Sequence, residues 1–250
     1  RLQAAGTVCR AFQASCNPSR ASLPPFEWGN FRFPDAAETS RASASIIQRL
    51  KDRKKQVLLH IGPNELSLDE ARLYRYLLSV AEGNDPRLIF VEPLPRTWPK
   101  LRKRMRYATG SNGSGEIIPM AVCPSSIGGL QTSPPTLYTF SPRLLHDFPS
   151  IPSEMFGDLS TLSLRQLLDS IPRFQQARNM PKLSDAEWLS SPYIQQIPVE
   201  CPTAALLLSE LGIEPGSIVM LTIDTEGFDT LLVPDFLELA NFQPALLEFE

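Results

Sequence analysis

The sequence is poor in the two residue types that most often hold a structural metal. It contains four cysteines and two histidines in 250 residues. No two cysteines form a Cys-x-x-Cys pair, so we assign no metal-binding residues and expect no cysteine/histidine zinc site. So few cysteines make a reducing compartment the default, and the expected location is cytoplasmic. The cysteines are Cys9, Cys16, Cys123 and Cys201.

Long apolar runs and a strong net charge are also missing. No run approaches the roughly 20 apolar residues that cross a bilayer, so no membrane span is expected. The net charge of −3 gives no general attraction to nucleic acid or to anionic membranes. Basic stretches at 51–55 and 100–106 are more typical of solvated helix faces than of nucleic-acid contacts.

The N-terminal segment lacks acidic residues and clear periodicity. Its first 26 residues contain three arginines and no acid. This composition is typical of an organelle transit peptide and equally typical of a disordered tail. We predict a flexible arm over 1–42 and one domain over 43–250. The chain begins with Arg1 and ends inside a predicted strand, which are two features of a fragment.

From residue 57 onward, short apolar runs alternate with helical segments. A Ser67–Glu70 capping box starts the first of these helices. The alternation predicts an α/β fold with a doubly wound, mainly parallel sheet. The expected strands are 57–61, 87–92, 117–123, 218–224 and 245–250. The expected helices include 43–55, 67–81, 204–211 and 228–242.

A long segment at 124–200 interrupts this alternation. It is rich in serine and proline, and only Ser160 to Ile171 has the apolar spacing of a helix. Loops of this length are usually either functional covers or disordered. A lid over the site and a flexible insertion are both consistent with the sequence.

Polar residues gather where the predicted strands end. The carboxyl ends of parallel strands meet at one edge of the sheet, where α/β folds bind ligands. Gly62 after the first strand would let the backbone approach a ligand. Glu92, which closes the second strand, can accept hydrogen bonds from two ribose hydroxyls. Asp224 and Glu226 close the fourth strand.

Two common nucleotide-binding motifs are absent at this edge. The first turn holds one glycine instead of Gly-x-Gly-x-x-Gly, so the cradle for a dinucleotide pyrophosphate is missing. No Gly-x4-Gly-Lys-Ser/Thr motif occurs either, which excludes a P-loop. A nucleoside cofactor without a pyrophosphate cradle fits these observations best.

The motifs at the strand ends resemble those of the FkbM-type S-adenosylmethionine-dependent methyltransferases. The resemblance covers roughly 55–123 and 200–250, and its most specific parts are Ile-Asp-Thr-Glu-Gly-Phe-Asp and Val-Glu-Pro-Leu-Pro. It implies a Rossmann-like methyltransferase fold that transfers methyl groups from S-adenosyl-L-methionine. The matching motifs are Ile-Gly-x-Asn (61–64), Phe-Val-Glu-Pro-x-Pro (90–95), Ile-Pro-Met-Ala-Val (118–122), Leu-Thr-Ile-Asp-Thr-Glu-Gly (221–227) and Leu-Leu-Glu (246–248).

The resemblance also implies roles for single residues. Gly62 and Asn64 would line the methionine side of the cofactor, and Glu92 would bind its ribose. Ala121 and Val122 would lie near the adenine. Asp224 and Glu226 would face the reacting centre. The implied reaction is O-methylation of a hydroxyl on a small-molecule or glycan acceptor.

The chain departs from the family pattern at three places. The family usually has an acid at the position of His60 and a second glycine near Leu66 or Ser67. Its sheet usually continues for two strands beyond the fifth, so the sheet predicted here is truncated. The altered first turn favours an alternative function, a catalytically inactive binding or scaffold module.

Three candidate site residues keep more than one interpretation. His60 is predicted to contact the cofactor, although a histidine ending a core strand is more often a hydrogen-bonded structural residue. Asp224 and Glu226 could take a proton from the acceptor hydroxyl, or hold a divalent cation with Glu250. Asp224 could instead cap the following helix.

Overall fold

The computed structural model describes most of the chain from residue 44 onward. Of the predicted arm, 1–42, only Val8–Cys9 is described, and Glu250 also lies outside the described residues. The described ranges are 8–9, 44–51, 55–81, 83–110, 115–128, 134–149, 151, 160–175 and 183–249.

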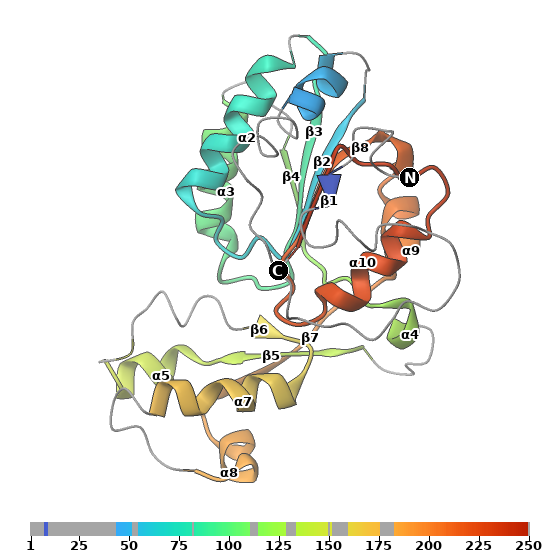
Figure 1. Ribbon diagram of the computed structural model, residues 1–250. Coiled ribbons are helices and arrows are strands. Elements are labelled where there is room, and N and C mark those ends of the chain that lie inside the picture. Colours follow the sequence, from blue (N-terminus) through green and yellow to red (C-terminus); the bar gives the residue numbers. More distant parts are fainter. Residues whose placement is uncertain are drawn as a thin grey trace.

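A six-stranded sheet forms the centre of the molecule, in the order β1-β9-β8-β2-β3-β4 (Figure 1). Every recorded pairing in it is parallel. The chain moves from β2 outward through β3 to β4, then returns to the other side of β2 as β8. The strands are β1 (Val8–Cys9), β2 (Val57–Ile61), β3 (Arg87–Val91), β4 (Gly115–Ile118), β8 (Ile218–Ile223) and β9 (Leu246–Phe249).

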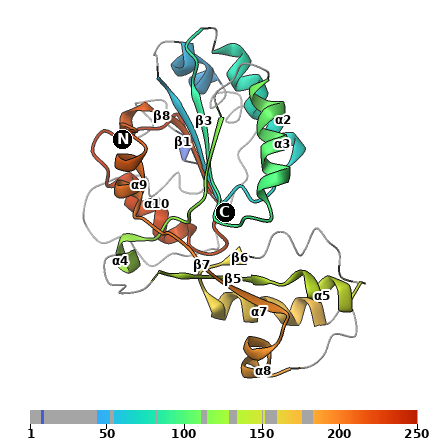
Figure 2. The same ribbon diagram turned by 180° about the vertical axis from the view of Figure 1, so that it is seen from behind.

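Helices cover both faces of this sheet, as Figures 1 and 2 show from opposite sides. One face packs against α2 and α3 and the other against α9 and α10, and each face has its own apolar cluster. Both β2 and β8 are buried along their whole length because both faces are covered. The helices are α2 (Leu68–Val80), α3 (Trp98–Thr109), α9 (Ala204–Glu210) and α10 (Asp229–Leu237), with further helical residues at 44–51 and 215–217.

This layering confirms the predicted α/β fold and is compatible with a Rossmann-like fold. The predicted capping box is also present, since Ser67 Oγ accepts from Glu70 N and Glu70 Oε2 accepts from Ser67 N. Within the described part of the chain, no helix combines the length and apolarity that a membrane crossing requires.

The third strand was predicted at 117–123 but lies at Gly115–Ile118. Its pairing with β3 ends where Glu92 N donates to Ile118 O. The next residue, Pro119, has no N–H for a ladder. Beyond it the chain turns away from the sheet, and Ala121 N donates to Glu200 O instead.

The insertion at 124–200 contains far more structure than its sequence pattern predicted. It holds a three-stranded antiparallel sheet in the order β6-β5-β7. Its own apolar core is built from residues such as Phe140, Leu167 and Trp188. The predicted helix at Ser160–Ile171 is confirmed from Leu164 onward as part of α7, whereas Ser160–Thr161 form a short strand, β6. The elements are α4 (Ser125–Gly128), β5 (Thr136–Phe140), α5 (Pro142–Asp147), β6 (Ser160–Thr161), α7 (Leu164–Gln175), α8 (Asp185–Ser190) and β7 (Ile194–Pro198).

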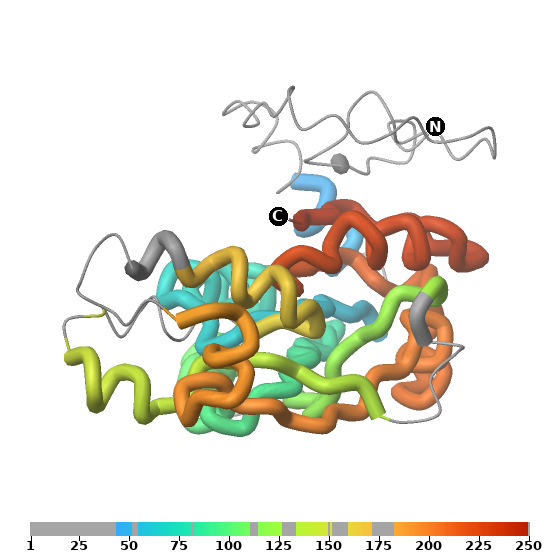
Figure 3. Tube along the Cα trace, turned by 90° about the horizontal axis from the view of Figure 1, so that it is seen from below, coloured from blue at the N-terminus to red at the C-terminus, as the bar shows by residue number. Residues whose placement is uncertain are grey.

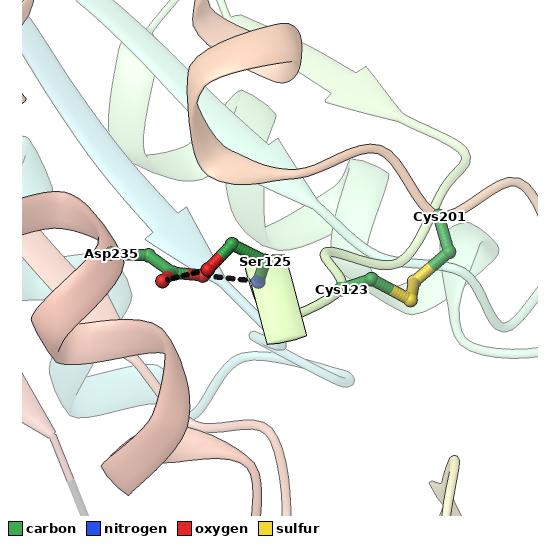
Figure 4. The surroundings of a disulfide bond; sticks show 4 residues. All are labelled: Cys123, Ser125, Cys201 and Asp235. Atoms are coloured by element: carbon green, nitrogen blue, oxygen red, sulfur yellow. Dashed lines mark hydrogen bonds between the residues drawn. A yellow bond between two sulfur atoms is a disulfide. The ribbon is translucent and has the colours of Figure 1, made fainter. Parts of the chain in front are cut away.

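This inserted unit lies beyond the carboxyl ends of the central strands (Figures 1 and 3). A disulfide between Cys123 and Cys201 joins the two places where the chain leaves and re-enters the central domain (Figure 4). Beside it, Asp235 of α10 accepts from both the backbone N and the Oγ of Ser125. The insertion is therefore fastened at its base.

Candidate functional site

A cavity of about 610 Å³ opens at the carboxyl ends of β2, β3 and β8. This is the point where the chain order of the strands reverses, and ligands of open α/β sheets bind there. The volume lies within the usual range for small-molecule sites. The predicted site residues that line it are Gly62, Asn64, Glu92, Ala121, Val122, Asp224 and Glu226.

Gly62 allows the ends of β2 and β8 to approach each other. Its φ is +75°, and a Cβ at this position would lie 1.8 Å from the carbonyl oxygen of Asp224. The Gly62 N–H donates to Val91 O. The sequence analysis predicted that this glycine lets the backbone approach a ligand. In the structure the close approach is to the protein's own backbone, and the ligand cavity lies beside it.

Glu92 is buried at the cavity wall and holds the first turn in place. Its Oε2 accepts from the backbone N of Asn64 and its Oε1 from the backbone N of Leu94, both at 2.8 Å. Burial raises the pKa of the Glu92 carboxyl to about 7, against the opposing effects of these two hydrogen bonds and of the nearby Arg96 charge. Each carboxylate oxygen keeps a second lone pair for a ligand hydroxyl.

Ala121 and Val122 belong to the segment that leads into the insertion. Both are buried and line the cavity. Their backbone is held by the returning segment after β7, because Ala121 N donates to Glu200 O and Cys123 N to Pro202 O. The cavity wall predicted to face an adenine is thus held by the same two segments, 121–123 and 200–202, that the disulfide joins.

Asp224 and Glu226 lie on the turn between β8 and α10. Asp224 N continues the sheet by donating to Ile61 O. Glu226 then adopts a φ of +51° and Gly227 a φ of +98°, so the backbone bends sharply. Both carboxylate residues line the cavity. Their roles toward an acceptor remain predictions.

Asp229, which the sequence analysis did not select, shapes this turn. Its Oδ1 accepts from Thr225 N and its Oδ2 from Gly227 N. These two bonds from Asp229 hold the backbone before α10, a position for which one interpretation of the sequence gave Asp224 as the capping residue. An acid in the first turn of a predicted helix was the available indication.

His60 does not line the cavity. The residue is 1 % exposed, its Nδ1 lies 3.0 Å from the Tyr74 hydroxyl, and its ring contacts Phe90 edge-on. Burial lowers the pKa of His60 to about 4, so the ring is neutral at physiological pH. Its side chain lies on the α2 face of the sheet with Tyr74, so this geometry does not support the predicted cofactor contact of His60.

The insertion supplies the opposite wall of the cavity. Leu137, Ser160, Thr161 and Leu162 line it. Arg96 ties the insertion to the Glu92 loop, since its guanidinium donates to Phe140 O and Thr139 Oγ1. The sequence left a lid and a flexible insertion equally open. The structure shows a packed unit whose residues form part of the site.

Both acids and cations line the cavity. The cations are Lys100 and Arg104 of α3, and Lys100 is ion-paired with Glu65. No group of three or more potential metal ligands occurs among the described residues, and Glu250, the third candidate ligand, lies outside them.

Comparison with known proteins assigns no family. No protein-family model, curated protein or solved structure shows a significant match to this chain. The resemblance to FkbM-type methyltransferases therefore rests on the sequence motifs alone.

Proposed function

We propose that the protein is an S-adenosyl-L-methionine-dependent methyltransferase that methylates a hydroxyl on a small molecule or glycan. One observation carries the proposal: the first turn, the buried acid after β3 and the strand-end acids of β8 surround a single cavity. These residues are far apart in sequence, and the motif resemblance gives each a role in the same reaction.

The residues present fit the cofactor. Glu92 has free acceptor capacity for ribose hydroxyls, and the buried Ala121 and Val122 offer an apolar surface for an adenine. Bound there, the cofactor would supply an electrophilic methyl group on a sulfonium. Asp224 or Glu226 would take the acceptor's hydroxyl proton. The protein's main contribution would be alignment of the two reactants.

A second candidate function is a catalytically inactive binding module. Leu66 occupies a left-handed conformation, with φ of +56°, in the turn where the resembling family usually has a glycine. The Glu92 pKa of about 7 also leaves part of its carboxyl protonated at neutral pH. Both features would weaken cofactor binding without changing the fold.

The cytoplasmic location stays a prediction, and the disulfide counts against it. Cys123 and Cys201 are bonded across a sequence separation of 78 residues. Disulfides persist mainly in oxidising compartments. We therefore favour an oxidising compartment for this chain.

Calorimetric titration with S-adenosylhomocysteine tests the proposal. We expect Glu92→Ala to weaken binding by about 1–3 kcal/mol, the usual loss for a charge-assisted hydrogen bond. Affinity of the unchanged protein should also rise about tenfold from pH 6 to pH 8, because ribose hydroxyls donate to the ionised carboxylate whose pKa is about 7.

The matched control is Glu116→Ala on the neighbouring strand. Glu116 pairs with Arg87 and does not line the cavity, so its removal should leave the affinity unchanged. Absence of binding by the unchanged protein would defeat the methyltransferase and cofactor-binding proposals together. Binding without methyl transfer to any hydroxyl acceptor would favour the inactive module.

A further inference from the structure

The turn that carries Asp224 and Glu226 has an unfavourable backbone conformation. Glu226 has a φ of +51° although it is not glycine. Residues other than glycine rarely adopt such angles, and they keep them only where surrounding contacts impose them. The contacts that impose this shape therefore determine where both carboxylates point.

Contacts from the insertion and from α10 bear on the turn. The insertion packs against it, since a Cβ at Gly227 would lie 2.1 Å from Gln166 Nε2. The Asp229 carboxylate accepts hydrogen bonds from the Thr225 N–H at 3.0 Å and from the Gly227 N–H at 3.2 Å. Asp229 is 3 % exposed, so water competes weakly for these bonds.

A carboxylate suits this position because both of its oxygens accept hydrogen bonds. An asparagine would offer one acceptor and would turn an N–H₂ toward one of the two backbone donors. The residue before Asp229, Phe228, makes no side-chain capping bond. The two printed bonds of the Asp229 carboxylate thus go to the turn that precedes α10 and not to amides within the helix.

We propose that Asp229 is a positioning residue that clamps the Thr225–Gly227 turn and thereby directs Asp224 and Glu226 into the cavity. Its effect on catalysis rests on the proposed methyltransferase function. The clamp itself is a property of the backbone and does not depend on any reaction. Asp229 touches neither acceptor nor cofactor under this proposal.

The test compares Asp229→Asn with Asp235→Asn. Asp235 lies on the same helix and also accepts a hydrogen bond from a backbone N–H, that of Ser125. It does not line the cavity. Amide hydrogen exchange of Thr225 and Gly227 is measured in the full chain, with β2 amides as an internal gauge of global opening. In parallel, S-adenosylhomocysteine affinity and methyl-transfer kinetics are measured.

We expect Asp229→Asn to speed exchange at Thr225 and Gly227 by about tenfold without changing exchange in β2, whereas Asp235→Asn leaves both unchanged. Turnover should fall by about tenfold or more while S-adenosylhomocysteine affinity stays within about threefold, because the cofactor residues are elsewhere. Should Asp229→Asn not accumulate as folded protein, Asp229→Ser, which keeps one acceptor oxygen, replaces it.

Unchanged exchange at Thr225 and Gly227 would overturn the clamp, as would equal effects of the two variants. A fall in turnover matched by an equal loss of cofactor affinity would overturn the positioning role. If the unchanged protein neither binds S-adenosylhomocysteine nor transfers methyl groups, the proposed function fails while the exchange result still decides the clamp.

Discussion

Two buried ionisable residues near the sheet's edge have pKa values shifted in opposite directions by the same cause. Burial lowers the pKa of His60 to about 4 and raises that of Glu92 to about 7. Desolvation penalises the charged form of each, which is the cation for histidine and the anion for glutamate. One residue supports the core and the other the cavity wall.

His60 makes a pH-dependent contribution to stability. Between pH 6.5 and pH 4, His60 binds a proton in the unfolded chain but not in the folded one. The free energy of unfolding therefore falls as the pH is lowered through this window. We expect a loss of about 3 kcal/mol. Urea denaturation of the unchanged protein and of His60→Gln measures this loss, since a glutamine amide can still form a hydrogen bond with the Tyr74 hydroxyl.

The variant isolates this contribution because Glu92 titrates in both proteins. Folded Glu92 binds its proton more tightly than the unfolded carboxyl, which has the opposite sign and cancels in the difference. A difference in stability that stays constant from pH 4 to pH 7 would show that His60 is not desolvated in the folded state.

At the scale of elements, the site depends on how closely β2 and β8 end together. Their register brings Ile61 beside Ile223, and the next residues, Gly62 and Asp224, touch through their backbones. A side chain at position 62 would separate the strand ends that carry the first turn and the carboxylate turn.

We expect Gly62→Ala to cost about 3 kcal/mol or more, because it adds a steric overlap to the strain of a positive φ. Gly83→Ala is the matched control. Gly83 also has a positive φ, of +80°, but a Cβ added there would meet no described atom within 4 Å, so we expect a loss of about 1 kcal/mol. Urea unfolding of both variants measures these losses in stability. Equal losses would contradict the close approach of Gly62 to the Asp224 backbone.

At the scale of the whole molecule, one disulfide closes the inserted unit onto the central domain. Cys123 follows the cavity residues Ala121 and Val122, and Cys201 lies where the chain returns to α9. The bond therefore restrains both the cavity wall that the insertion supplies and the segment expected to face an adenine.

Reducing this bond should lower the free energy of unfolding by about 4.5 kcal/mol, the chain-entropy estimate for a closed loop of this length. Denaturation with and without reductant measures the loss, and thiol alkylation confirms reduction. The control is a Cys123→Ala/Cys201→Ala variant, on which reductant should have no effect. Full alkylation without loss of stability would contradict a stabilising role.

Much of the architecture could be predicted from local sequence. The buried runs of β2 and β8 and the Ser67–Glu70 capping box act over a few residues, and each has the expected structure. The strand-end residues could also be grouped, because parallel strands bring their carboxyl ends to one edge. The insertion was located at 124–200, but its internal sheet was not predicted, because its antiparallel strands are short and separated by long connections.

The orientation of individual side chains was decided by tertiary structure. Both faces of β2 are buried, so its uniformly apolar neighbours do not indicate which face His60 joins; the register places it with Leu58 and Phe90 beneath α2. The Cys123–Cys201 bond and the two hydrogen bonds of Asp229 likewise depend on backbone geometry that no local pattern encodes. Sequence by itself determined the layered α/β sheet and the edge that carries its polar residues, because periodicity and strand-end position are local properties. Tertiary structure alone decided which of those residues face the cavity, because that depends on the packing of segments distant in the chain.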